Sequence, residues 1–216
     1  MSALQRVFVP ILLAIVLVSS GCVGFLTGSE ALTFEATPGM VSSDVLTETG
    51  YEYNGTNEVQ MTRTFEVADQ KREVMVTNHL SEYQRSIDLG TFGGERKAAV
   101  FAVFTTPQVK IAGETFNPVG EMSNRELLEQ LQSRYETIQI DERVERNIVT
   151  TLGTDATVET YAGQANFGGV NVDIRVQITT VKHDGDFVIA IGVYPRLLPG
   201  EGETVRNLIR GLEHGS

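Results

Sequence analysis

The chain has 216 residues, of which 41% are hydrophobic and 21% charged, the composition of an ordinary globular protein. Its 17 lysines and arginines against 28 aspartates and glutamates give a formal charge of -11, which excludes the cationic surface that nucleic-acid binding requires. A single cysteine and three histidines exclude an internal disulfide framework and a cysteine-rich zinc site.

Residues 1–21 are organised like a secretory signal peptide. Arg6 precedes an apolar run over residues 7–18, and three small residues stand directly before Cys22. Small residues before a cysteine resemble a lipoprotein signal, in which the thiol becomes linked to a lipid and cleavage leaves Cys22 first. We therefore predict a lipidated tether over residues 22–30 that holds the protein to membrane lipid on the extracytoplasmic face of the cell membrane.

Two alternatives to the lipid anchor stay open. The uncharged run extends over residues 7–29, which is long enough to span a bilayer of about 30 Å as an uncleaved helix. Alternatively, the signal peptide is cleaved and Cys22 remains a free thiol on a secreted protein.

The chain has more acidic than basic residues, and most of its basic residues are arginines. Only four of the 17 cationic residues are lysines, and an acidic surface that avoids lysine favours a protein adapted to molar salt. The tripeptide Asn54-Gly55-Thr56 is a glycosylation sequon, which makes Asn54 a candidate attachment site.

The first half of the mature chain reads mainly as strands. Residues 31–36 alternate apolar and polar side chains, and a short helix is expected after Ser42 or Ser43. Residues 59–68 and 72–83 alternate around a polar turn, which predicts an antiparallel pair. Residues 97–106 are nearly all apolar, so we expect a central strand that is buried on both faces.

The second half contains the clearest helices. Ser123 and Glu126 form a capping box before an apolar stripe, which predicts a helix from that point. Strands are expected over residues of about 136–151, 155–165 and 170–181. A tight turn at residues 183–186 leads into a further strand, and residues 201–214 repeat apolar side chains with helical spacing.

This inventory predicts a single α+β domain over residues 31–216. A curved antiparallel β-sheet of about six or more strands would bury its apolar face under the mid-chain helix and the C-terminal helix.

The final block of the chain, GDFVIAIGVYPRLLPGEGETVRNLIRGLEHG, resembles the PsbP/Mog-one-like superfamily in its last strand, short loop and closing helix. From the residues before Cys22 through this block, the chain is also similar to uncharacterised acidic lipoproteins of halophilic archaea, a family whose domain has no known function. The superfamily resemblance implies the same α+β fold and a protein that binds or helps assemble other proteins. That implication is an analogy, since fold does not fix function.

No residue set indicates catalysis, a cofactor or a metal. His183, Asp184 and Asp186 could hold a hard cation, but Asp-Gly is ordinary turn chemistry, and we expect an exposed hairpin tip and no metal site. His214 is expected at the end of the last helix, where it complements the negative helix end. Paired carboxylates such as Glu201 and Glu203, or Asp141 and Glu142, indicate solvated surface in so acidic a chain, so we predict that the protein is not an enzyme.

The long connection over residues 107–122 is the best candidate for a binding lip. It carries four apolar side chains, Val109, Ile111, Phe116 and Val119, which either cover the core or line a groove beside the C-terminal helix.

We therefore expect a non-catalytic lipoprotein that binds a protein partner or acts as an accessory or assembly factor at the cell surface. The alternative is a lipoprotein that binds a small molecule and delivers it to a membrane transporter, which requires a sizeable apolar pocket.

Overall fold

The computed structural model describes residues 31–67, 70–88, 95–111, 114–115, 117–134, 138–167 and 170–215. They fall into two compact units, one that includes residues 31–34, 61–67 and 70–76 and another that includes the described residues of 35–60 and 77–215. The described part of the first unit contains the beginning of strand β1 (Leu32–Glu35) and segments of β3 (Glu52–Val67) and β4 (Gln70–Asp88).

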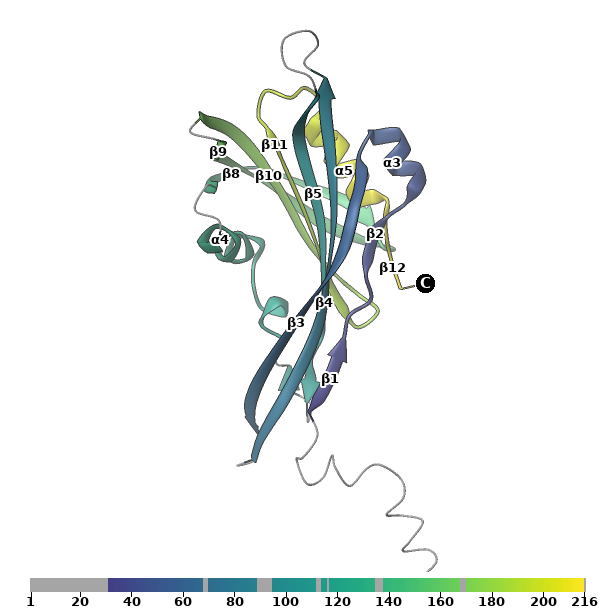
Figure 1. The fold of residues 1–216 in the computed structure, drawn as a ribbon, viewed down its shortest axis with the longest axis vertical. Coiled ribbons are helices and arrows are strands. Elements are labelled where there is room, and N and C mark those ends of the chain that lie inside the picture. Colours follow the sequence, from purple (N-terminus) through teal and green to yellow (C-terminus); the bar gives the residue numbers. More distant parts are fainter. Residues whose placement is uncertain are drawn as a thin grey trace, which may run out of the picture. The chain divides into compact units, whose positions relative to one another are not determined.

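The second unit contains most of an open eight-stranded sheet, and with its helices the fold is of the α+β kind predicted (Figure 1). Strand β3 pairs with β4, and from β4 the order continues through five further strands. These are β5 (Glu95–Pro107), β11 (Asp186–Pro195), β10 (Val170–His183), β9 (Thr154–Phe167) and β8 (Ile138–Thr151). Every neighbouring pair from β4 to β8 is antiparallel.

Short elements complete the second unit. Strand β2 (Gly39–Val41) pairs with β12 (Leu212–His214), and β6 (Lys110–Ile111) pairs with β7 (Glu114–Thr115). The helices are α3 (Ser43–Thr49), α4 (Asn124–Arg134), α5 (Glu201–Arg210) and the 3-10 turn η2 (Pro118–Gly120).

Helix α5 covers one face of the sheet. Its Val205, Leu208 and Ile209 are fully buried in a cluster with side chains of β4, β5, β8, β9 and β11 of the large sheet. The cluster also includes Phe101 and Val103 of β5, whose side chains are inaccessible to solvent. Burying a side chain of this size contributes about 1.5–3 kcal/mol, so this layer is a major source of stability.

Helix α4 belongs to a second, separate cluster. Leu128 is fully buried among side chains of β8 to β11, and Leu127 and Leu131 pack around it. The predicted capping box fixes where this helix begins, because Ser123 N donates to Glu126 Oε2 at 2.7 Å and Glu126 N donates to Ser123 Oγ at 3.3 Å.

The predicted turn at residues 183–186 is confirmed. His183 and Asp186 pair across the hairpin, and Asp184 and Gly185 have φ angles of 45° and 87°. Two consecutive positive φ angles are what a two-residue turn between twisted strands needs, and Asp-Gly tolerates them.

Two expectations are wrong in detail. The last helix ends at Arg210 instead of continuing to His214, because residues 212–214 pair with β2 and Ser42 N donates to Gly211 O at 2.9 Å. Strand β5 is not buried on both faces. Val100 is 43% exposed, since α4 packs over β8 and β10 and leaves this part of the sheet uncovered.

Helix α5 packs directly against Gly192 of β11, which has no side chain. A Cβ built there would lie 2.5 Å from Cγ1 of Val205, so we expect Gly192→Ala to destabilise the protein by about 1–3 kcal/mol. Urea unfolding measures this loss. The Gly192→Ala/Val205→Ala double variant should lose less stability than the sum of the single variants, and strict additivity would contradict the packing argument.

Candidate functional site

A cluster of histidines and aspartates forms where the β10–β11 turn meets the C-terminal strand. The turn brings His183 and Asp186 side by side, and the pairing of His214 with Gly39 places β12 against them. The contact therefore depends on the hairpin and on the strand that replaces the predicted last helical turn.

The cluster is a chain of three side chains. Asp186 Oδ2 accepts from Thr37 N at 2.8 Å and lies 3.1 Å from His214 Nε2. His214 Nδ1 lies 3.1 Å from His183 Nδ1. Because Nε2–H of His214 donates a hydrogen bond to the carboxylate, a neutral His214 presents a lone pair at Nδ1, and His183 Nδ1–H donates to it.

The structure corrects the expectation of an exposed hairpin tip. Asp184 is exposed, but the side chain of Asp186 is only 8% exposed and that of His214 is fully buried. The sequence predicts His214 at a helix end, and no local pattern could place it beside Asp186 and His183, which are 28 and 31 positions away. Among the described residues, no group of three or more His, Cys, Asp or Glu side chains is arranged to hold a metal ion.

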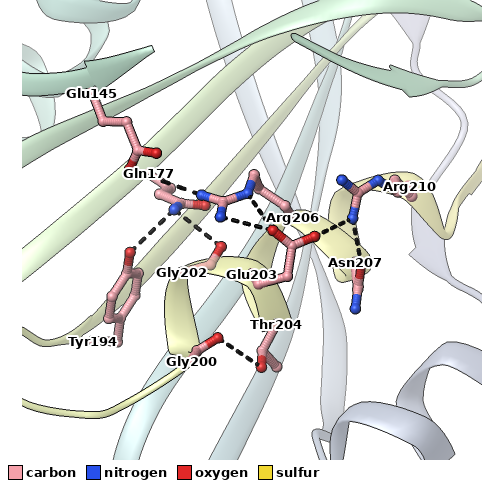
Figure 2. Close-up of polar contacts among 10 residues, drawn as sticks. All are labelled: Glu145, Gln177, Tyr194, Gly200, Gly202, Glu203, Thr204, Arg206, Asn207 and Arg210. Atoms are coloured by element: carbon pink, nitrogen blue, oxygen red, sulfur yellow. Dashed lines mark hydrogen bonds and ion pairs between the residues drawn. The ribbon is translucent and has the colours of Figure 1, made fainter. Parts of the chain in front are cut away.

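A second polar cluster surrounds the first turn of α5 (Figure 2). Gln177 of β10 is fully buried, and its Nε2 donates to Tyr194 Oη and to Gly202 O, both at 3.1 Å. Gly202 allows this approach, because a Cβ there would lie 2.9 Å from Tyr194 Oη.

The outer side of the same turn is charged. Figure 2 shows Arg206 between Glu203, which it binds through two nitrogens at 2.9 and 2.8 Å, and Glu145 of β8 at 3.9 Å. Arg210 also donates to Glu203, at 2.7 Å. The hydrogen bonds from Arg210 and Arg206 lower the pKa of Glu203. These contacts tie α5 to itself and to β8.

Two oxygens beneath this cluster have no partner among the described residues. They are Gln177 Oε1 and Thr160 Oγ1, on side chains that face each other across β9 and β10. Directly paired side chains on one sheet face have Cβ atoms about 5 Å apart, so one polar group between them could satisfy both oxygens.

A buried carboxylate lies at the start of α5. Glu201 is fully buried, accepts from Tyr51 Oη at 2.8 Å and forms an ion pair with Arg85 of β4. The expectation that Glu201 is solvated surface is therefore wrong. The sequence around Glu201 gives no sign of these contacts, because Arg85 and Tyr51 are 116 and 150 residues away. A charge without water is tolerated only when paired in this way.

The edge strand β8 presents apolar side chains to solvent. Ile148 is 72% exposed and Val144 is 46% exposed. The pairing with β9 shifts register on both sides of Arg143 and is regular from Glu145 to Thr151. Among the described strands, none pairs with the outer side of β8. This regular half therefore offers free backbone groups beside exposed Ile148.

Two of the four residues predicted to form a lip, Val109 and Val119, have side chains that the structure describes. Val109 is 3% exposed, and Val119 packs against the α4 cluster, whereas α5 belongs to the other cluster. Val109 and Val119 therefore pack into the core. The side chain of Ile111 and the whole of Phe116 lie outside the described residues.

The predicted attachment sites differ in what the structure describes. Asn54 is exposed on β3, so its side chain is open to modification, and Cys22 lies outside the described residues. No helix among the described residues is long and apolar enough to cross a membrane.

A family model for a domain of unknown function, DUF6517, matches residues 38–213, and the chain belongs to that family. The match begins just before β2 and ends within β12, so it includes the polar cluster around the first turn of α5 and the edge strand β8. No curated protein matches the chain.

The buried tyrosines predict a loss of stability at high pH. Burial is the main cause that raises the pKa of Tyr51, Tyr83, Tyr161 and Tyr194, and the carboxylate of Glu201 raises that of Tyr51 further. In the unfolded chain these hydroxyls ionise near pH 10, so the stabilisation is complete below that pH and is lost as the pH rises. Each group contributes a slope of up to about 1.4 kcal/mol per pH unit.

Urea unfolding between pH 9 and about pH 11 tests this expectation. Tyr51→Phe should lower stability at pH 8 by about 1–3 kcal/mol, because Glu201 loses a donor, and should also flatten the decline above pH 10. An unchanged slope in the variant would show that Tyr51 is not held neutral by the fold.

Proposed function

We propose that this member of the DUF6517 family is a membrane-anchored extracytoplasmic lipoprotein whose non-catalytic domain binds a protein partner. The N-terminal sequence supports the anchor, because an apolar run and three small residues precede Cys22. The exposed edge strand β8 carries the binding proposal.

The resemblances in the sequence agree with this proposal. The PsbP/Mog-one-like likeness of the final strand and helix favours a domain that binds or helps assemble other proteins. The acidic, lysine-poor composition favours a halophilic archaeal source, where carboxylates keep a surface hydrated in molar salt.

The regular half of β8 is the part of the domain best suited to a partner strand. Its residues 145–151 pair with β9 on one side, and no described strand pairs with them on the other. Natural sheets usually protect such an edge with charges, prolines or bulges. The register shifts and charged side chains at residues 141–146 protect one half of β8, but Ile148 stands unprotected in the other half. Strand addition uses this combination of free backbone and an apolar anchor.

Delivery of a small molecule is the second candidate function. The observation that favours it is the pair of unpartnered buried oxygens on Gln177 and Thr160, which could receive a polar ligand group under α5. If no partner binds at β8, delivery of a small molecule becomes the better supported function.

The anchor predicts the chemistry of the mature N-terminus. We expect mass spectrometry of membrane-extracted protein to find a chain that begins at Cys22 and carries lipid mass. Cys22→Ser should abolish the lipid mass, because serine has no thiol, whereas Ser20→Ala should leave it unchanged. A wild-type chain with intact Met1 would support the spanning helix instead, and an unmodified Cys22 at the N-terminus would support free secretion.

The edge strand predicts where a partner makes contact. With a photoreactive amino acid in place of Ile148, we expect one cross-linked species of defined mass in intact cells at native salt. The same amino acid at Leu197, which is 83% exposed and lies on a loop, should yield none. Equal products from both positions, or no product from position 148, would overturn the binding proposal. A product of exactly twice the chain mass would identify self-association in place of a separate partner.

A further inference from the structure

We propose that His183 and His214 together bind a late first-row transition metal ion, of which zinc and copper are the best candidates, through their Nδ1 atoms. This site is separate from the edge strand and does not rest on the proposed function. It uses the one place among the described residues where two imidazole nitrogens face each other.

The spacing of the two nitrogens suits such an ion. Two nitrogens bound to tetrahedral zinc at about 2.05 Å lie roughly 3.3 Å apart, and at a right angle they lie roughly 2.9 Å apart. The observed separation of His183 Nδ1 and His214 Nδ1 is 3.1 Å, between these values. The rings are nearly perpendicular, at 76°, and rotation of the partly exposed His183 side chain would direct its Nδ1 lone pair at an ion bound to His214.

His214 Nε2, the ring nitrogen that would not bind the ion, is held by a carboxylate, as in many metal sites. Asp186 Oδ2 lies 3.1 Å from His214 Nε2, and the backbone N–H of Thr37 fixes that carboxylate. A carboxylate behind a ligating histidine sets its tautomer and leaves the inner nitrogen unprotonated. The side chain of His214 is fully buried, so this tautomer is determined by the fold.

His183 supplies the second ligand and the route of entry. Its side chain is 25% exposed, so water reaches the ring. When the ion binds, Nδ1 releases its proton to water and Nε2 takes one from water, so a neutral ring stays neutral. Asp184 Oδ2 lies 3.6 Å from His183 Nδ1 on a side chain that is 62% exposed. A rotation of Asp184 would add a third ligand, and water would complete the coordination.

This donor set selects among metals. Imidazole nitrogens suit zinc, copper and nickel, whereas calcium and magnesium need an oxygen cage. The same ion would join β12 to the β10–β11 turn, so metal binding and the stability of the C-terminal strand are linked.

Thermal unfolding of the full chain tests the site, with Cys22→Ser as the background so that no thiol takes part. We expect zinc at about 100 times its Kd to raise the unfolding midpoint by about 5–10 °C, and magnesium to leave it unchanged. His183→Ala should remove the zinc effect, and His79→Ala should retain it, because His79 lies on β4 outside the cluster. An unchanged midpoint in the unsubstituted cluster, or an equal rise in His183→Ala, would overturn the proposal.

A second measurement does not depend on the stability of a variant. The chain has three histidines, so its imidazole proton resonances are few. Substoichiometric copper should broaden the resonances of His183 and His214 and leave that of His79 sharp. Equal broadening of all three, or broadening of none, would contradict a site at this pair.

Discussion

The buried ion pair between Glu201 and Arg85 is the contact on which the rest of the second unit depends. Glu201 is the first residue of α5, and the hydroxyl of Tyr51 satisfies its other oxygen. A carboxylate taken out of water is strongly unfavourable unless it is paired, so the helix can begin at one place only. The ten residues of α5 cross the apolar layer and end before Gly211. The carbonyl of Gly211 accepts a hydrogen bond from Ser42 N, and the residues that follow form β12. His214 reaches Asp186 because Glu201 is held at the other end.

This arrangement divides the sheet into a closed face and a partly open one. Helix α5 fills the first face so closely that Gly192 and Gly202 have no room for a side chain. Helix α4 packs over β8 and β10 on the other face, and Val100 of β5 remains half exposed. The described residues therefore have apolar side chains in solvent at a few defined places, and Ile148, which is 72% exposed on the edge strand β8, is one of them. In an acidic protein, a neutral β-branched segment at a sheet edge stands out as a surface for contact.

Local chemistry predicted the elements better than their partners. The capping box of Ser123 and Glu126 and the Asp-Gly turn after His183 each specify a backbone geometry within four residues, and both formed as expected. The apolar spacing of 201–214 could not reveal that the helix ends at Arg210, because Leu212 also fits the strand that pairs with Val41. Neither the burial of Glu201 nor the approach of His214 to His183 has a local signal. Both are consequences of strand order, and the sequence pattern near each residue reads equally well as surface.

The two polar clusters at the ends of α5 therefore differ in character. The cluster at its start is saturated, since Glu201 has both its oxygens bound, and adding a ligand there would break contacts that hold the helix. The cluster beyond the end of α5 is different, because His183 Nδ1 and His214 Nδ1 share a single proton in one hydrogen bond. Without that proton, both nitrogens would present lone pairs. Replacing that proton by an ion breaks a single hydrogen bond and keeps the contact of His214 with Asp186. In the histidine pair, the buried His214 is held in place and His183 is partly exposed to solvent. The hydrogen bond between them is weak enough to be replaced. An ion can therefore bind there without unfolding α5.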